Sequence, residues 1–259
     1  MVLSTQPARL AARMVLTAVL LCACGGTTAT QGSGSGDAKA AGATVTSLAA
    51  GQLDALPTGT VYLQVNEFNQ SPGAVTKSSK HVPAIVIQVA GVQRLMVEGS
   101  PPVDYQAGQA YFLASVTHSH LNSGPAANHW FNFALWPSAQ RAAPPVPSAR
   151  VAFATPDLPS DALPAGAYAI SLQRVTLVPH GHTQAHKYGG IDVVFVMSGS
   201  ISTHADGRSP STLNADSGSY ALAGTGLQEY DDSDQPATFV SFVIAAVGQP
   251  FETPLTRSL

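Results

Sequence analysis

Two groups of side chains in this sequence could bind a metal ion. The first half of the chain carries His81 and His118, with His120 two residues further on, and the second half carries His186 and Asp192. Imidazole and carboxylate ligands suit Fe, Mn, Ni, Cu or Zn, and the geometry of the site selects among these metals. Since alternate residues of a strand share a face, His118 and His120 would point to the same side of a strand.

Neither group is a full ligand set, because a tight site usually has three or four protein ligands. The first half offers two or three imidazoles and no acid. These could form a Zn or Cu site, but we favour a structural role for them as polar groups inside the barrel. In the second half, His180, His182 and His186 form a His-x-His-x3-His string that could collect a metal alone. The internal repeat and the spacing from Asp192 to Gly199 favour the pairing of His186 with Asp192 over this string.

Other chemical motifs are weak. An acidic cluster over 229–234 predicts a solvated loop, and it lacks the spacing of an EF-hand. The sequence holds no Gly-x-Ser-x-Gly and no phosphate-binding or dinucleotide-binding glycine motif.

The composition predicts a turn-rich β protein. Of 259 residues, 45% are hydrophobic and 10% charged, and 23 glycines and 19 prolines provide turns. The net charge of −3, with no long basic run, leaves no electrostatic footprint for nucleic acid, so we expect no nucleic-acid partner.

The first residues predict export. Arg9 and Arg13 precede a short apolar run that ends in small residues before Cys24, a pattern that resembles the lipobox of bacterial lipoproteins. We therefore expect a signal peptide over residues 1–23, lipidation of Cys24 and a flexible Gly/Ser/Ala/Thr tether over 24–45. Cys22 is a poorer candidate because Leu21 precedes it, and an ordinary signal peptide is the alternative. The protein would be exported and anchored to the membrane of the bacterial cell envelope.

The rest of the chain contains an internal repeat. Leu56-Pro57-Thr58-Gly59 recurs as Leu163-Pro164-Ala165-Gly166, 107 residues later, and three further matches follow in the same order at shifts of 107 to 109. The repeat predicts one all-β domain over 46–140 and another over 163–250. A Pro/Ala-rich linker over 141–162 would join them, with a tail over 251–259, and residues 47–56 would form a short helix at most.

In the second repeat, the residues from Gly181 to Gly199 resemble the first motif of the cupin superfamily. His186 stands at the first histidine of that motif, Tyr188 at the second and Asp192 at the acid, with six residues between Asp192 and Gly199. Tyrosine in place of histidine and aspartate in place of glutamate depart from the pattern.

In the first repeat, the residues from Gly108 to Asn122 resemble the second cupin motif, with His118 and Asn122 at the expected spacing. The internal repeat places Leu227 at the position equivalent to His118. It makes His81 equivalent to Tyr188 and Ser79 equivalent to His186. The acid position of the first repeat holds Ala84 or Ile85, so each half keeps ligands that the other half lacks.

The resemblance implies two tandem cupin-type jelly-roll barrels and one divalent transition metal at most, held by His81, His118, His186 or Asp192. We expect a lipid-anchored protein that binds a small-molecule ligand through a weakened metal site. A metal-dependent enzyme of oxidoreductase type is the alternative, and a structural part of an envelope assembly is a third hypothesis. The strand Trp130–Trp136 would turn one face to the core and one to the other domain, or else a tryptophan would line a ligand pocket.

Overall fold

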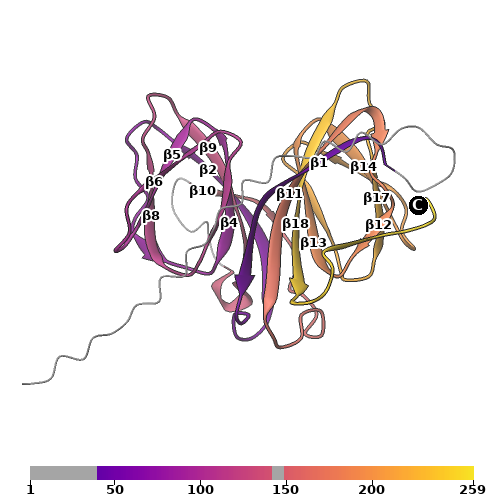
Figure 1. The fold of residues 1–259 in the computed structure, drawn as a ribbon, viewed down its shortest axis with the longest axis horizontal. Helices are drawn as coiled ribbons and strands as arrows, with labels where there is room; N and C mark the ends of the chain where they lie inside the picture. The colour runs from indigo at the N-terminus through magenta and orange to yellow at the C-terminus, as the bar shows by residue number, and fades with distance from the viewer. Residues whose placement is uncertain (1–39, 142–148) are drawn as a thin grey trace, which may run out of the picture.

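The computed structural model describes residues 40–141 and 149–259. The predicted signal peptide, Cys24 and most of the tether lie outside these residues. The described part is almost entirely β-structure in two barrels, one from each half of the sequence, which lie side by side (Figure 1). None of its helices is long and apolar enough to cross a membrane.

The first barrel consists of two sheets. One has the strand order β10-β2-β9-β4-β7 and the other has the order β3-β8-β5-β6. The strands are β2 (Val61–Gln70), β3 (Ser79–Lys80), β4 (Ala84–Ala90), β5 (Val92–Val97), β6 (Val103–Gln106), β7 (Ala110–Leu113), β8 (Thr117–Asn122), β9 (Asn128–Pro137) and β10 (Ala149–Ala154), with a 3-10 turn over Ser138–Gln140.

The second barrel is one continuous sheet with the order β15-β14-β17-β11-β18-β13-β16, to which β1, β12 and β19 add. Its strands are β1 (Ala41–Leu53), β11 (Tyr168–His182), β12 (His186–Tyr188), β13 (Gly190–Ser198), β14 (Ser200–Ala205), β15 (Ser211–Asn214), β16 (Gly218–Ala221), β17 (Gly226–Tyr230), β18 (Ala237–Ala246) and β19 (Glu252–Pro254).

The strand register confirms the internal repeat. Val65 pairs with Phe133 in the first barrel, and Leu172 pairs with Phe242 at the equivalent place in the second. Near the expected site, Ser79 pairs with His118 and His186 pairs with Leu227. The equivalences drawn from the sequence therefore hold in three dimensions.

The main hydrophobic core lies between the two barrels. Apolar side chains of β2, β4 and β9 pack against those of β11, β13 and β18, with Phe131 and Phe133 contacting Phe195 and Phe242. Period-two alternation produces this arrangement, because every second side chain of these strands points to the same face. The opposite faces of β2 and β9 are then free to line the interior of the first barrel.

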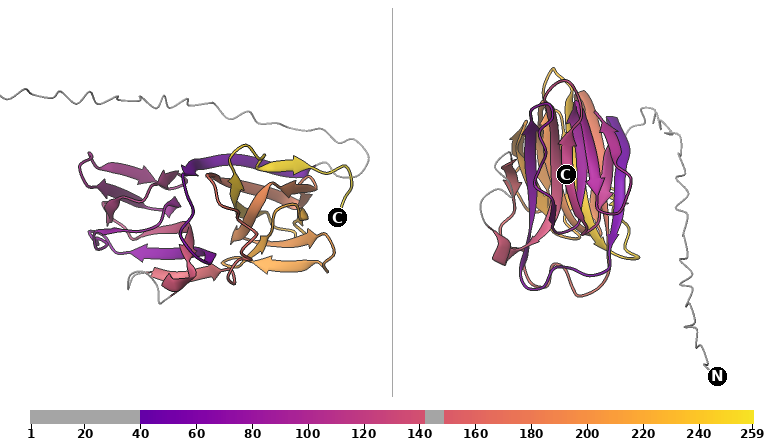
Figure 2. Two further views of the ribbon diagram at one scale, coloured as in Figure 1. Left: turned by 90° about the horizontal axis from the view of Figure 1, so that it is seen from below. Right: turned by 90° about the vertical axis from the view of Figure 1, so that its left-hand side faces the viewer.

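Two strands correct the sequence predictions. Residues 47–56 do not form a helix, since β1 continues to Leu53 as an antiparallel partner of β11, and the tether ends by Ala41 at the latest. Most residues of β1 are small or β-branched, so helical periodicity is absent and sheet pairing decides their conformation. Within the expected linker, β10 pairs with β2 and extends the first barrel. Figure 2 shows β1 in indigo lying along the second barrel.

Candidate functional site

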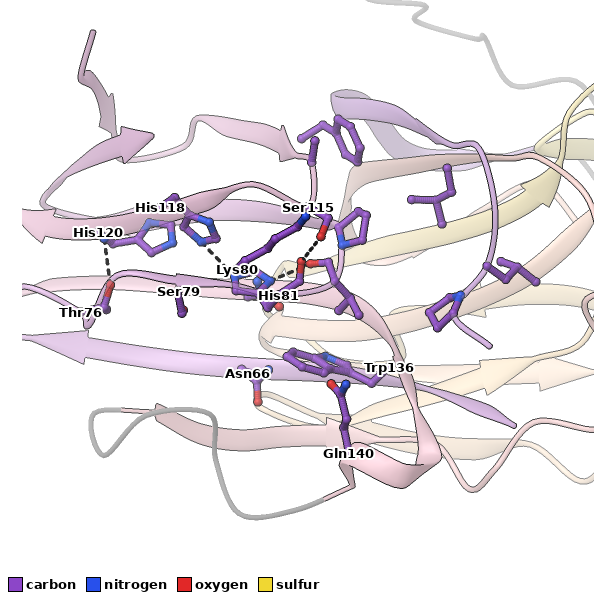
Figure 3. A pocket seen from close by; sticks show the side chains of 18 of the residues that line it. Asn66, Thr76, Ser79, Lys80, His81, Ser115, His118, His120, Trp136 and Gln140 are labelled. Carbon is purple, nitrogen blue, oxygen red and sulfur yellow. Dashed lines mark hydrogen bonds between the residues drawn. The ribbon is translucent and has the colours of Figure 1, made fainter. Parts of the chain in front are cut away.

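The first barrel encloses a cavity of about 770 Å³. One wall comes from β2 and β9 and the other from β3, β8 and the residues that follow β3 (Figure 3). The lining includes the aromatic side chains of Trp130, Trp136, Phe68 and Phe112 and the polar side chains of Asn66, Asn132, His81, His118 and His120. A partly apolar cavity with a few convergent polar groups is typical of a small-molecule site.

His81 and His118 meet on the wall formed by β3, β8 and the residues that follow β3, which is the histidine wall of the cavity. Their Nε2 atoms lie 2.9 Å apart. The Nδ1 of His81 lies 2.7 Å from the carbonyl oxygen of Val82, and the Nδ1 of His118 lies 2.8 Å from that of Val116. A carbonyl oxygen only accepts, so both Nδ1 atoms must donate, and in the neutral rings both Nε2 atoms are bare acceptors.

Two bare acceptors at this distance attract one another only through a shared proton or a cation. Backbone carbonyls orient metal-binding histidines in the same way, through the nitrogen that does not bind the metal. Two nitrogen ligands of one tetrahedral ion lie about 3.3 Å apart, given metal–nitrogen bonds of about 2.0 Å. The pair therefore fits two corners of a cation site.

His120 lies beside this pair and is almost fully buried. Its ring centroid lies 5.0 Å from that of His118, and its Nδ1 lies 3.3 Å from the hydroxyl of Tyr111, which donates to Gln93. Burial lowers the pKa of His120 well below its ordinary value, and the neighbouring His118 and His81 lower it further. Burial also lowers the pKa of His81 and of His118. All three rings are therefore uncharged over a wider pH range than a free histidine.

The first barrel provides only some of the ligands that the metal implied by the sequence would need. His81 and His118 would hold it, but no group of three or more His, Cys, Asp or Glu side chains converges to hold an ion within 40–141 or 149–259. The acid position is Ala84, which is buried and pairs with Leu113 and Ala134. A bound ion would therefore need its other ligands from water or from a bound molecule.

The wall opposite the histidines carries polar atoms that lack hydrogen-bond partners among the described residues. These atoms are Nδ2 of Asn66, Oδ1 of Asn132 and Nε1 of Trp136. Asn66 and Asn132 are buried and pair directly across β2 and β9. A buried polar group without a partner costs about 1–3 kcal/mol, so each of these atoms is poised for a ligand or water.

The tryptophan strand fits both sequence interpretations, because one face packs against the other barrel and the tryptophans of the other face line a cavity. Phe131, Phe133 and Leu135 enter the core between the barrels, while Trp130 and Trp136 line the cavity. Trp130 is held in place, since it stacks on Phe68 at 3.6 Å and its Nε1 donates to Gln70. The ring of Trp136 faces that of His81 at a centroid distance of 6.0 Å.

Part of the cavity rim comes from a strand of the other barrel. Residues 52–57, which are the last two residues of β1 and the four that follow it, line the cavity, and β1 pairs with β11. Gly51 at the end of β1 lies against the ring of Phe112, where a Cβ would overlap the ring. The second barrel therefore helps to position the mouth of the first.

The equivalent site of the second barrel is packed. Leu227 pairs with His186, and with Tyr188, Ala221, Val243 and Ala245 it forms a small apolar cluster. The nearby cavity has a volume of about 60 Å³. Tyr188 lies between the two predicted ligands: its ring contacts His186, and its hydroxyl lies 3.1 Å from Oγ of Ser241, which donates its one proton to Asp192.

Asp192 is fully buried, and burial raises its pKa to about 8, with Ser241 opposing the shift. Burial favours the neutral form of Asp192, which disfavours it as a metal ligand, and Leu227 has no donor atom. The second barrel therefore does not fit a metal ion. Oδ2 of Asp192 and Nε2 of His186 have no hydrogen-bond partner in the described part of the chain.

The alternative histidine string is not assembled either. His180 is exposed and contacts Asp234, while His182 lies near Gln228 and Thr183. In the acidic cluster, the prediction of a solvated loop was wrong for Glu229 and Asp231, which are buried. Thr183 donates to Glu229, and Ser233 donates to Asp231.

The comparisons with known proteins bear on the fold. No protein-family model matches the sequence, and no curated protein matches it. Among solved structures, a mutant of oxalate decarboxylase from Bacillus subtilis aligns with a TM-score of 0.55 at 11% identity, covering 79% of each chain. AerE from Microcystis aeruginosa aligns with a TM-score of 0.51 at 12% identity, covering 76% of this chain and 98% of its own.

At these identities the likeness establishes the fold alone. The protein is an all-β chain of two tandem cupin-type jelly-roll barrels, as the sequence predicted. Asn66 and the paired role of Asn132 were missed, because pairing across β2 and β9 joins residues 66 positions apart. The available signal was the presence of polar residues on the inward face of strands whose other face is largely apolar.

Proposed function

We propose that the first barrel binds a small organic molecule and that the second barrel serves as its scaffold. The observation that carries this proposal is the cavity of about 770 Å³ whose walls present tryptophan rings and unpartnered polar atoms. The incomplete set of metal ligands supports binding as the main role. The rim contributed by the end of β1 supports the scaffold role.

A fluorescent dye with apolar rings and one sulfonate group, anilinonaphthalene sulfonate, provides the test because its rings fit a cavity of this size. We expect saturable binding of one dye per chain. Trp136→Ala should weaken binding by about tenfold, since aromatic contacts contribute about 1 kcal/mol or more. Phe251→Ala, which removes a half-buried aromatic side chain beside the second barrel, should leave affinity unchanged. An absence of saturable binding would refute the proposal.

A metal-dependent enzyme is the second candidate function. It is favoured by the facing Nε2 atoms of His81 and His118. One structural neighbour, the oxalate decarboxylase of Bacillus subtilis, is described with Mn(II) centers. Any metal here would supply a Lewis acid beside the cavity, and His81 and His118 would hold it. One equivalent of metal that resists a chelator, and is lost in His118→Ala, would favour this candidate.

We further propose that Cys24 carries a lipid that anchors the protein to the cell envelope. The support is the small-residue pattern before Cys24 and the Gly/Ser-rich stretch after it. Multiple acyl chains bind membranes firmly, because each buried CH₂ contributes about 0.8 kcal/mol. Cys24→Ser should move the protein from the membrane fraction to the soluble fraction. Unchanged membrane association of the variant would contradict lipidation.

A further inference from the structure

The polar atoms in the first barrel specify the chemistry of its ligand. Nε2 of Gln64 donates to Oδ1 of Asn66 at 2.7 Å, which leaves Nδ2 of Asn66 as a free donor. Directly across the strand pair, Oδ1 of Asn132 is an acceptor without a partner in the described residues. A neighbouring donor and acceptor call for a group that both accepts and donates.

A hydroxyl group meets this requirement, because it accepts two hydrogen bonds and donates one. A carboxylate would satisfy Asn66 but would repel Oδ1 of Asn132, and an ammonium group would do the reverse. Nε1 of Trp136 adds a second donor on the same wall. This wall therefore matches two or more neighbouring oxygen atoms, at least one of which is a hydroxyl.

The histidine wall presents hydrogen-bond acceptors, so it would bind a ligand group that donates. The Nδ1 atoms of His81 and His118 donate to backbone carbonyls, so their Nε2 atoms, which lie 2.9 Å apart, are acceptors at the edge of the cavity. A hydroxyl group on the far side of a ligand could donate to either Nε2. A ligand with hydroxyls on both edges would thus engage both walls at once.

The charge of the cavity is low. Of the described lining residues, only Asp54, Lys77 and Lys80 carry a formal charge at neutral pH, and all three are exposed to solvent. The interior therefore offers neutral hydrogen bonds beside the broad ring of Trp136. A saturated ring presents C–H groups on its faces and hydroxyls on its rim, which suits an indole face and polar walls together.

We propose that the first barrel binds a neutral, polyhydroxylated ring molecule of monosaccharide or cyclitol size, held between Asn66, Asn132 and Trp136 on one wall and His81 and His118 on the other. This inference rests on the proposed function of the first barrel and names its ligand class. It assigns Asn66 and Asn132 as specificity-determining residues.

The test is calorimetric titration of the full chain with a panel of neutral pyranoses and with myo-inositol, at up to about 10 mM. At least one compound should bind saturably, and cyclohexanol, which has a similar ring and a single hydroxyl, should bind far more weakly. Asn132→Leu and Trp136→Phe should each weaken binding by about tenfold, the effect of one lost hydrogen bond. Asn69→Leu is the matched control, because Asn69 is exposed on β2, the strand that pairs with β9, and contacts Glu67.

Dye binding separates the possible failures. A cooperative thermal unfolding transition shows that a variant is folded, and retained saturable binding of anilinonaphthalene sulfonate then shows that its cavity is open. If the dye binds to the wild-type chain and no polyhydroxylated compound does, the ligand class is wrong and the proposed function stands. If neither binds, both are wrong. If binding survives Asn132→Leu and Trp136→Phe, the assignment of the wall is overturned.

Discussion

The Nε2 atoms of His81 and His118 point at each other across 2.9 Å, while the Nδ1 atom of each ring is tied to a backbone carbonyl. This contact makes the pair a receptor for one proton, one cation or a hydroxyl group. The two barrels differ at this place, because the equivalent residues of the second barrel, Tyr188 and Leu227, have no imidazole.

The first prediction concerns metal content. With two protein ligands in place, the chain should purify with well under one metal per molecule, while added Zn²⁺ should bind weakly and be lost in His118→Ala. Burial lowers the pKa of both His81 and His118, so Zn²⁺ should stay bound below the ordinary histidine pKa and leave only as pH falls further. Elemental analysis and titration measure both effects.

His129→Ala is the matched control for this prediction, because His129 pairs with Glu67 and does not line the cavity. One equivalent of metal that survives dialysis against a chelator would contradict the expectation. That result would favour a metal-dependent enzyme over a binding protein as the function of the chain.

The second prediction restores a ligand in the second barrel. Leu227→His would put an imidazole opposite His186, whose Nε2 has no partner in the described residues. We expect metal uptake to rise above that of the wild type, in a variant whose cooperative thermal unfolding shows that it is folded. Leu227→Gln imposes a similar cost of burying a polar group without adding an imidazole. Equal uptake by both variants would show that position 227 does not face a metal-binding site.

The third prediction concerns pH. Asp192 has an ordinary pKa of 3.8 that burial raises to about 8 in the folded protein. Between these values the folded state holds a proton that the unfolded state releases, so this residue lowers the free energy of unfolding as pH rises through that window. The slope is at most about 1.4 kcal/mol per pH unit.

Asp192→Asn should remove that contribution, because an amide resembles the protonated acid and keeps an acceptor for Ser241. Denaturant unfolding at several pH values gives the measurement. The variant should be more stable than the wild type at pH 8 and closer to it at pH 5. A parallel pH profile of the two proteins would show that Asp192 is ionised in the folded state.

The fourth prediction concerns the shared rim. Gly51→Val should force the end of β1 away from Phe112, since overpacking costs about 1–3 kcal/mol, and it should displace the rim over residues 52–57. Dye affinity should fall by about fivefold or more. Ala50→Val changes an exposed neighbour on the same strand and should have no effect. Unaltered affinity in Gly51→Val would mean that β1 does not position the cavity.

Much of the fold was predictable because it rests on local patterns. Alternation in the strands of each half, together with shifts of 107 to 109, was enough to equate Leu172 with Val65 and Leu227 with His118. The strand β1 was not predictable, because its partner β11 is more than a hundred positions away and its own residues bury little. The candidate site was predictable at His81 and His118, where residue type signals chemistry.

The polar wall was harder to predict. Asparagine is common in turns, and only the three-dimensional pairing of Asn66 with Asn132 shows that both are buried and face a cavity. The packing around Asp192 also depends on contacts from β18, which supplies Ser241. Such long-range contacts decide whether a polar residue binds a ligand or stabilises a core.

The most direct test of ligand binding in the first barrel uses the two tryptophans of the chain, Trp130 and Trp136, both of which line its cavity. Tryptophan emission is recorded while anilinonaphthalene sulfonate is titrated into the wild-type protein. Our account predicts that tryptophan emission falls with the same midpoint at which dye emission rises, because the bound dye lies within the same cavity. Dye binding that leaves tryptophan emission unchanged would place the ligand elsewhere and contradict the account.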